Sequence, residues 1–175
     1  MKRTVFLTLS CLGALASCQT IDELPNQRLA QATLRQASGL PAGTAQLFSN
    51  GSEVTISIAL AGIPAGTHGV HLHMTGRCDA PAFTTAGGHL NPAGRQHGHE
   101  NPAGAHLGDL PNVTTGAAGA GTVSATLQGT PQEILANLFD ADGTAIVVHA
   151  GPDDYRTDPS GNSGARIACG VLTRV

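Results

Sequence analysis

Histidine is the residue type in this chain that points most directly to chemistry. The chain contains eight histidines but a single lysine. Two of the histidines, His71 and His73, form an H-x-H pair between apolar neighbours. Successive side chains of a strand point to opposite faces, so both imidazoles would emerge on the same face. Two ring nitrogens side by side on a strand make half of a metal site, although such a pair alone also fits two exposed strand histidines.

The residues after this pair supply further candidate ligands. Met74 to Gly121 shows no convincing strand pattern, and a loop of this length is usually functional or held by something other than its own core. Three histidines and one carboxylate form a closed tetrahedral set, which is typical of structural zinc. Gly108 would permit a tight turn that brings His106 and Asp109 onto one ion. The set consists of His89, His97, His106 and Asp109.

One further histidine, His149, is a candidate ligand. His149 ends the apolar run 145–149 and is placed to join the H-x-H pair. Six histidines spaced in this way favour metal binding over exposed strand histidines. His99 lies two residues after His97 and is not expected to be a ligand. His68 precedes the H-x-H pair and is expected at a turn or on the surface.

Short strands must position these side chains. Ser52–Ala59 and Gly121–Gln128 alternate apolar and polar residues, which predicts two half-buried strands. Weaker strand patterns cover Leu29–Leu34 and Thr44–Ser49. The one helix-like stretch covers Pro131–Leu138. Many short strands with turns between them predict an antiparallel sandwich or barrel.

Composition supports a turn-rich β protein. The chain has 23 glycines and 10 prolines, and only 3% of its residues are aromatic, so small aliphatic side chains must fill the core. Asn50-Gly51 and Asp142-Gly143, each ahead of a predicted strand, are hairpin-turn signals. Charged residues make up 12% and the formal charge is −3, which excludes a disordered polyelectrolyte and argues against a nucleic-acid partner.

The N-terminus predicts export. Lys2 and Arg3 precede twelve largely apolar residues, Val5–Ala16, which are too few to span a bilayer but typical of a signal peptide. The segment ends in Leu-Ala-Ser-Cys, and this sequence resembles the lipobox in which the cysteine, here Cys18, becomes the acylated first residue. An ordinary secretory signal cut nearby is the alternative. The expected organisation is a signal peptide at 1–17, a lipid-anchored tether at 18–28 and one domain at 29–175.

Four cysteines are present, and their positions separate their roles. Cys11 lies in the signal segment and Cys18 would carry lipid. Cys78 and Cys169 remain as one pair in an oxidising compartment, which predicts a disulfide. Two buried free thiols are the alternative.

Taken together, six motifs resemble the copper/zinc superoxide dismutases in their order and spacing, over about Leu29 to Val175. The resemblance implies an all-β fold, namely an eight-stranded Greek-key β-barrel of the immunoglobulin-like sandwich type with two long functional loops. The motifs are Gly69-Val-His-Leu-His73, Gly88-His89-Leu-Asn-Pro92, His97-Gly98, His106-Leu-Gly-Asp109, Val148-His149 and Gly164-Ala-Arg166-Ile-Ala-Cys-Gly170.

The same resemblance implies one copper and one zinc ion per subunit. Copper would be bound by His71, His73, His89 and His149, and zinc by His89, His97, His106 and Asp109. His89 would bridge the two ions. Asp153 would link a copper ligand to a zinc ligand, and Cys78 and Cys169 match the family disulfide.

The implied activity is dismutation of superoxide to dioxygen and hydrogen peroxide, with His89 and the active-site arginine, Arg166, as catalytic residues. Copper can change oxidation state, and a fixed cation beside it would attract a small anion. A lipid-anchored enzyme of this kind would protect the cell envelope, or periplasm, from oxidative damage. A non-catalytic dismutase-like zinc/copper-binding envelope protein and a copper-buffering protein are the alternatives, and neither needs Arg166. The family includes monomers and dimers, so a homodimer is compatible with the resemblance.

Overall fold

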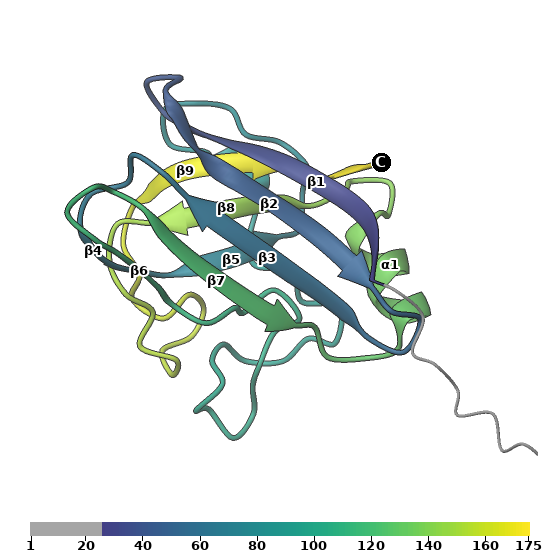
Figure 1. The fold of residues 1–175 in the computed structure, drawn as a ribbon. Helices are drawn as coiled ribbons and strands as arrows, with labels where there is room; N and C mark the ends of the chain where they lie inside the picture. The colour runs from purple at the N-terminus through teal and green to yellow at the C-terminus, as the bar shows by residue number, and fades with distance from the viewer. Residues whose placement is uncertain (1–25) are drawn as a thin grey trace, which may run out of the picture.

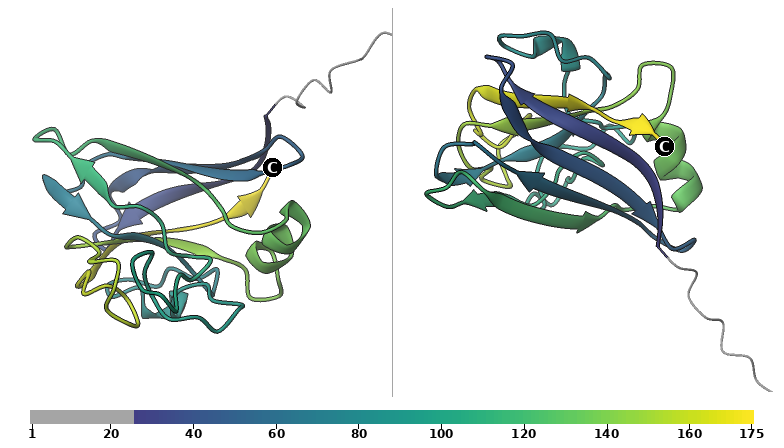
Figure 2. Two further views of the ribbon diagram at one scale, coloured as in Figure 1. Left: turned by 90° about the horizontal axis from the view of Figure 1, so that it is seen from below. Right: turned by 45° about the horizontal axis from the view of Figure 1, so that its top comes forward.

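One curled antiparallel sheet dominates the computed structural model, which describes residues 26–175. Its strands run in the order β5-β8-β9-β1-β2-β3-β7, and a short β10 also pairs with β1. β1, β2, β3 and β7 form one layer, and β5, β8 and β9 form the other (Figures 1 and 2). The bounds are β1 Gln27–Gln36, β2 Pro41–Ser49, β3 Val54–Leu60, β5 Val70–His73, β7 Gly121–Thr126, β8 Ala145–His149, β9 Arg166–Val171 and β10 Thr173–Arg174.

Two short strands join the edges of this sheet. β4, Gly66–His68, pairs with β6, Val113–Thr115, in a separate two-stranded sheet. β4 leads into β5 through Gly69, and β6 leads into β7 through a turn at 116–120. The pair therefore connects the β5 edge to the β7 edge at one end of the barrel. This architecture confirms the predicted all-β class, a Greek-key β-barrel.

The core lies between the two layers and is aliphatic, as composition predicts. Alternate residues of β3, Val54, Ile56 and Ile58, are at most 1% exposed and face it. Val70 and Leu72 of β5 face it too, so the histidines between them point the other way. A second apolar cluster, centred on Phe83 and Cys169, lies apart from this core. The histidines of β5 are therefore outside the aliphatic core but still buried.

Local sequence explains most element ends. α1, Pro131–Leu138, has the predicted bounds because Thr130 and Glu133 form a reciprocal capping box and proline occupies the first turn. Asn50 closes the β2–β3 hairpin, since its Oδ1 accepts the main-chain N–H groups of Ser52 and Glu53. A single-turn 3₁₀ helix, η1, spans Thr84–Ala86.

The second predicted hairpin is wrong. Asp142-Gly143 lies between α1 and β8, so it connects a helix to a strand. Asp140 makes the turn there, because its Oδ1 accepts the main-chain N–H groups of both Asp142 and Gly143. The dipeptide does form a tight turn, with Gly143 at φ +67°, but the sequence after a turn cannot reveal what precedes it.

The N-terminal predictions fall largely outside the described residues. The signal peptide, Cys18 and most of the tether precede residue 26. β1 begins at Gln27, two residues before the predicted start of the domain. Among residues 26–175, no helix is long and apolar enough to cross a membrane.

Candidate metal centre

Two clusters of buried ligand atoms lie side by side where the long loop meets the edge of β5. The first, which we call the copper group after the metal that the resemblance implies, contains His71, His73, His89 and His149. The second, here the zinc group, contains His89, His97, His106 and Asp109. In each, the ligand atoms lie within 4.8 Å of one another. These are the residues that the sequence analysis proposed for each metal.

The long loop after β5 returns to pair with that strand. Leu72 donates its main-chain N–H to the Gly108 carbonyl at 2.9 Å and accepts one from Leu90 at 2.8 Å. His71 thereby lies opposite Asp109, and His73 opposite His89. Main-chain pairing thus brings two distant parts of the loop against the H-x-H pair.

Gly108 permits this pairing for a reason other than the expected turn. A Cβ at this position would collide with the Leu72 carbonyl oxygen and lie 2.9 Å from the Leu90 nitrogen. The glycine is therefore needed for close approach of the loop to β5.

The hydrogen bonds of the copper group leave one nitrogen of each ring available to a metal ion. His71 donates Nε2–H to Asp153, His73 donates Nδ1–H to the Gly87 carbonyl, and His149 donates Nδ1–H to the Gly164 carbonyl. Each bond fixes which ring nitrogen carries the hydrogen. The other ring nitrogen of each of these histidines, and Nε2 of His89, are buried and have no hydrogen-bond partner within residues 26–175. Four such nitrogens facing one another are what a copper-type imidazole site requires.

Burial keeps these imidazoles neutral, which is the form that binds metal. It lowers the pKa of His71 to about 3, that of His73 to about 2 and that of His149 to about 4. The positive charge of Arg166 contributes to the low pKa of His73 and of His149.

The zinc group is arranged around one carboxylate oxygen. Oδ1 of Asp109 lies 2.9 Å from His89 Nδ1, 3.0 Å from His97 Nδ1 and 3.1 Å from His106 Nδ1. Ligand atoms around a tetrahedral zinc ion with bonds near 2.0 Å are about 3.3 Å apart. The set therefore has the donor types and compactness of a zinc site, and His89 contributes its two nitrogens to the two groups.

Hydrogen bonds also hold the Asp109 carboxylate ionised. Oδ2 accepts the main-chain N–H groups of Gly98 and His106. Burial alone would raise the pKa of Asp109, but these bonds and the histidines keep it well below its usual range. An anionic ligand in a buried site favours a cation beside it.

Asp153 connects the two groups. Its Oδ2 accepts Nε2–H of His71 at 2.8 Å, and its Oδ1 accepts Nε2–H of His97 at 2.9 Å. All three side chains have no exposed area. Burial opposes a charge on His97, but the carboxylates of Asp109 and Asp153 outweigh it and raise its pKa to about 9, so zinc binding at Nδ1 would release a proton. Asp153 therefore orients one member of each group.

Arg166 lies at the start of β9, paired with His149 across the sheet. Its guanidinium donates to the Phe83 carbonyl at 2.7 Å and to the Gly87 carbonyl at 2.6 Å. The Gly87 carbonyl also accepts the hydrogen of His73, so arginine and copper group share one anchor. Arg166 is half-buried and, among residues 26–175, pairs with no carboxylate, so its charge is available to an anion.

A disulfide links Cys78 to Cys169, as predicted. It joins the loop that carries Phe83 and Gly87 to β9, the strand that carries Arg166. Cys169 packs with the buried ring of Phe83 in the second apolar cluster. The disulfide is consistent with an exported protein.

His68 contradicts the expectation of a surface or turn residue. It lies in β4, is 2% exposed, and its two ring nitrogens contact the His149 and Pro64 carbonyls. Nothing in its sequence neighbourhood distinguishes a buried histidine from an exposed one. His99 belongs to neither metal group, as expected, and contacts the Asp109 carbonyl.

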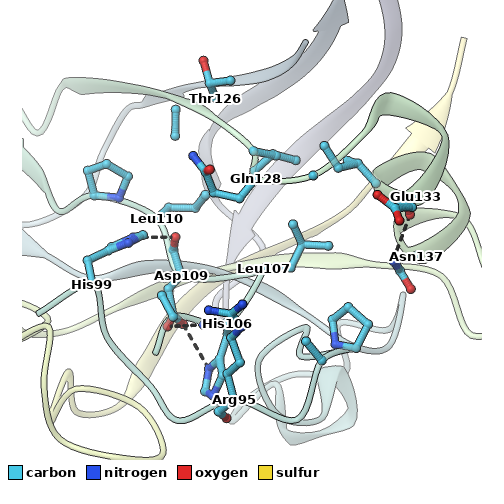
Figure 3. A pocket seen from close by; sticks show the side chains of 18 residues that line it. Arg95, His99, His106, Leu107, Asp109, Leu110, Thr126, Gln128, Glu133 and Asn137 are labelled. Atoms are coloured by element: carbon cyan, nitrogen blue, oxygen red, sulfur yellow. Dashed lines mark hydrogen bonds and ion pairs between the residues drawn. The ribbon is translucent and has the colours of Figure 1, made fainter. Parts of the chain in front are cut away.

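A wide cleft opens on the zinc side, and Arg166 does not line it. It has a volume of about 860 Å³ and lies between the long loop, the end of β7 and α1. Figure 3 shows His106 and Asp109 on one wall and Glu133 and Asn137 of α1 on the opposite side. A small anion needs no cleft of this size, so cleft volume does not locate the chemistry.

Comparison with known proteins agrees with this geometry. Residues 41–172 match the family model for copper/zinc superoxide dismutase. A curated relative, superoxide dismutase [Cu-Zn] 2 of Aquifex aeolicus, is 42% identical over 82% of this chain and 85% of its own length.

Solved structures show the same likeness. A crystal structure of a SOD-like protein from Bacillus subtilis is 38% identical, covers 82% of this chain and 97% of its own, and has a TM-score of 0.74. The Cu/Zn superoxide dismutase from Brucella abortus is 26% identical, with a TM-score of 0.61 over 81% of this chain and 98% of its own.

Proposed function

This chain belongs to the copper/zinc superoxide dismutase family, and on that premise we propose how its residues carry out the reaction. The activity is dismutation of superoxide to dioxygen and hydrogen peroxide, with copper and zinc as cofactors. We assign copper to His71, His73, His89 and His149, and zinc to His89, His97, His106 and Asp109. Bound copper supplies the one-electron chemistry, because it has two accessible oxidation states.

Arg166 binds and orients the substrate. Its two carbonyl anchors fix the guanidinium beside the copper group, and its positive charge attracts the superoxide anion. Focusing of this kind raises association rates by roughly 10- to 1000-fold.

Protons are the second requirement, since each hydrogen peroxide formed consumes two. Nε2 of His89 is buried in the copper group and has no hydrogen-bond partner in the described part of the chain. It would carry one of these two protons in one half of the cycle and release it in the other half, and solvent would supply the second proton. Asp109, in contact with Nδ1 of the same ring, holds that ring in place.

One observation carries this function. Four unpaired imidazole nitrogens face one another beside a fixed guanidinium, so redox ligands and an anion-binding charge are both present. A dismutase-like protein that only stores or binds metal has no use for that guanidinium.

Metal removal tests the activity. Protein loaded with copper and zinc is expected to accelerate superoxide decay, measured by pulse radiolysis, whereas protein treated with a copper-selective chelator is expected to lose this activity and keep zinc. Decay at the background rate with both metals bound would favour the non-catalytic alternative.

We also propose a lipid anchor at Cys18, which would hold the domain at the cell envelope by way of a tether at 18–28. The lipobox-like sequence supports this, and the disulfide fits an oxidising compartment such as the periplasm. We include a homodimer in the proposal because the family resemblance is compatible with one.

Replacing Cys18 by serine is expected to release the protein from the membrane fraction and leave its specific activity unchanged. Stable attachment takes about two lipid signals, which an acylated lipoprotein cysteine provides, and all metal-site residues lie beyond residue 70. Detergent partitioning of cells that express each form measures the change. Retention of the variant in the membrane would contradict the anchor.

A further inference from the structure

The position of Asp153 sets the orientation of two predicted metal ligands, so the residues that hold Asp153 matter to both metals. Its carboxylate contacts His71 and His97, each of which uses its other nitrogen in a metal group. Oδ1 also accepts the main-chain N–H of Tyr155 at 2.7 Å. Neither metal group includes Tyr155.

Asn112 holds the main chain of Asp153 from the other side. Its side-chain Nδ2 donates to the Asp153 carbonyl at 2.9 Å, and its Oδ1 accepts the Asp153 N–H at 2.8 Å. This reciprocal pair fixes both main-chain groups of the residue. The main-chain N–H of Asn112 in turn donates to the hydroxyl oxygen of Tyr155 at 2.7 Å. The Tyr155 hydroxyl therefore holds Asn112, which in turn holds the main chain of Asp153.

Tyr155 also ties the loop of Asp153 to the loop of the zinc ligands. Its carbonyl accepts the main-chain N–H of Glu100 at 3.0 Å. A Cβ on Gly98 would collide with that carbonyl, so the two loops are in direct main-chain contact. Tyr155 adopts φ +61°, a left-handed conformation that is uncommon for a non-glycine residue and is often found at functional sites. Figure 2 shows the two loops, in teal and yellow-green, side by side below the sheet.

We propose that Tyr155 is a positioning residue for the metal centre, and that its hydroxyl, through Asn112, holds Asp153 where one carboxylate orients both His71 and His97. This rests on the proposed metal assignment. Groups that orient metal ligands commonly contribute about 10- to 100-fold to metal affinity when removed directly. Tyr155 acts one contact further away, so a smaller effect is expected.

Tyr155→Phe in the copper- and zinc-loaded protein tests this role, because it deletes only the hydroxyl. Zinc release to a chromophoric chelator is expected to be about threefold to tenfold faster, the effect of one lost hydrogen bond. With Co²⁺ in place of zinc, the visible absorption bands are expected to shift, because ligand orientation changes. Thr144→Val is the matched control, since it removes a buried hydroxyl bond to the Leu138 carbonyl at the opposite end of β8 from His149. It should lower stability without altering zinc release.

A pair of glycines in the same loop tests the orienting role of Asp153, on which the role of Tyr155 depends. Gly161 and Gly164 both have positive φ, +64° and +78°, so alanine strains the backbone at either position. A Cβ on Gly161 would collide with Asp153 Oδ1 and lie 2.6 Å from His97 Nε2, whereas one on Gly164 meets nothing closer than 4.0 Å. Gly161→Ala is therefore expected to speed zinc release, and Gly164→Ala is not.

The outcomes separate this proposal from the metal assignment. If the wild-type protein binds no zinc, or His97→Ala keeps it, the metal assignment is wrong. If wild type binds one zinc ion that His97→Ala loses, while Tyr155→Phe shows wild-type release and an unchanged Co²⁺ spectrum, the positioning role of Tyr155 is wrong and the assignment stands. Equal effects of Tyr155→Phe and Thr144→Val on zinc release would likewise overturn the positioning role of Tyr155.

Discussion

Replacement of His149 by alanine is expected to abolish superoxide dismutation while zinc stays bound. Nε2 of His149 faces only the copper group, so its loss leaves three imidazoles for copper and the complete zinc group. We expect activity to fall by about two orders of magnitude or more. Elemental analysis of the purified variant gives the metal content, and pulse radiolysis gives the rate.

Asp109→Ala is the matched control, because Asp109 belongs only to the zinc group. Its carboxylate contacts three histidines and two main-chain N–H groups, so the variant should lose zinc and about 3 kcal/mol or more of stability. Thermal unfolding measures that loss, and copper should be affected less directly. If both variants lose both metals equally, the division into two sites is wrong.

The sequence predicted the local arrangement of the histidine pair on β5. Histidine spacing on an alternating strand places two imidazoles on one face, and β5 shows this arrangement. The capping residues around Pro131 predicted α1 for a similarly local reason. Ligands that are far apart in the sequence, such as His73 and His149, could be grouped only through the family resemblance. Nothing in the residues between them indicates that they lie close together.

Main-chain contacts could not be predicted. The anchors of Arg166 are the carbonyls of Phe83 and Gly87, and every residue type has a carbonyl. His68 was placed on the surface because a histidine that bonds two carbonyls has the same sequence signature as an exposed one. Asn112 and Tyr155 were missed for the same reason, since the first acts through main-chain groups of a distant loop.

The charge distribution makes Arg166 the decisive residue for the catalytic interpretation. Residues 26–175 contain no lysine and seven arginines. Arg77 pairs with Asp79 and Arg156 with Glu100, so these two cations are neutralised locally. The other four arginines lie in β1, in β10 and in the long loop after β5, so Arg166 is the arginine whose charge lies beside the copper group.

Arg166→Ile is expected to leave copper and zinc content unchanged and to lower activity by about tenfold or more. The guanidinium donates only to carbonyls and belongs to neither metal group, so its loss removes charge and no ligand. Arg166→Lys should give an intermediate rate, because an ammonium restores the charge but not the planar fork held by two carbonyls. The wild-type rate should fall as salt rises, and this dependence should flatten in Arg166→Ile. Pulse radiolysis across a salt series measures both effects. An Arg166→Ile protein with full metal content and an unchanged rate would show that the metal centre works without a fixed cation, and the proposed mechanism would then be wrong even with both metal sites correct.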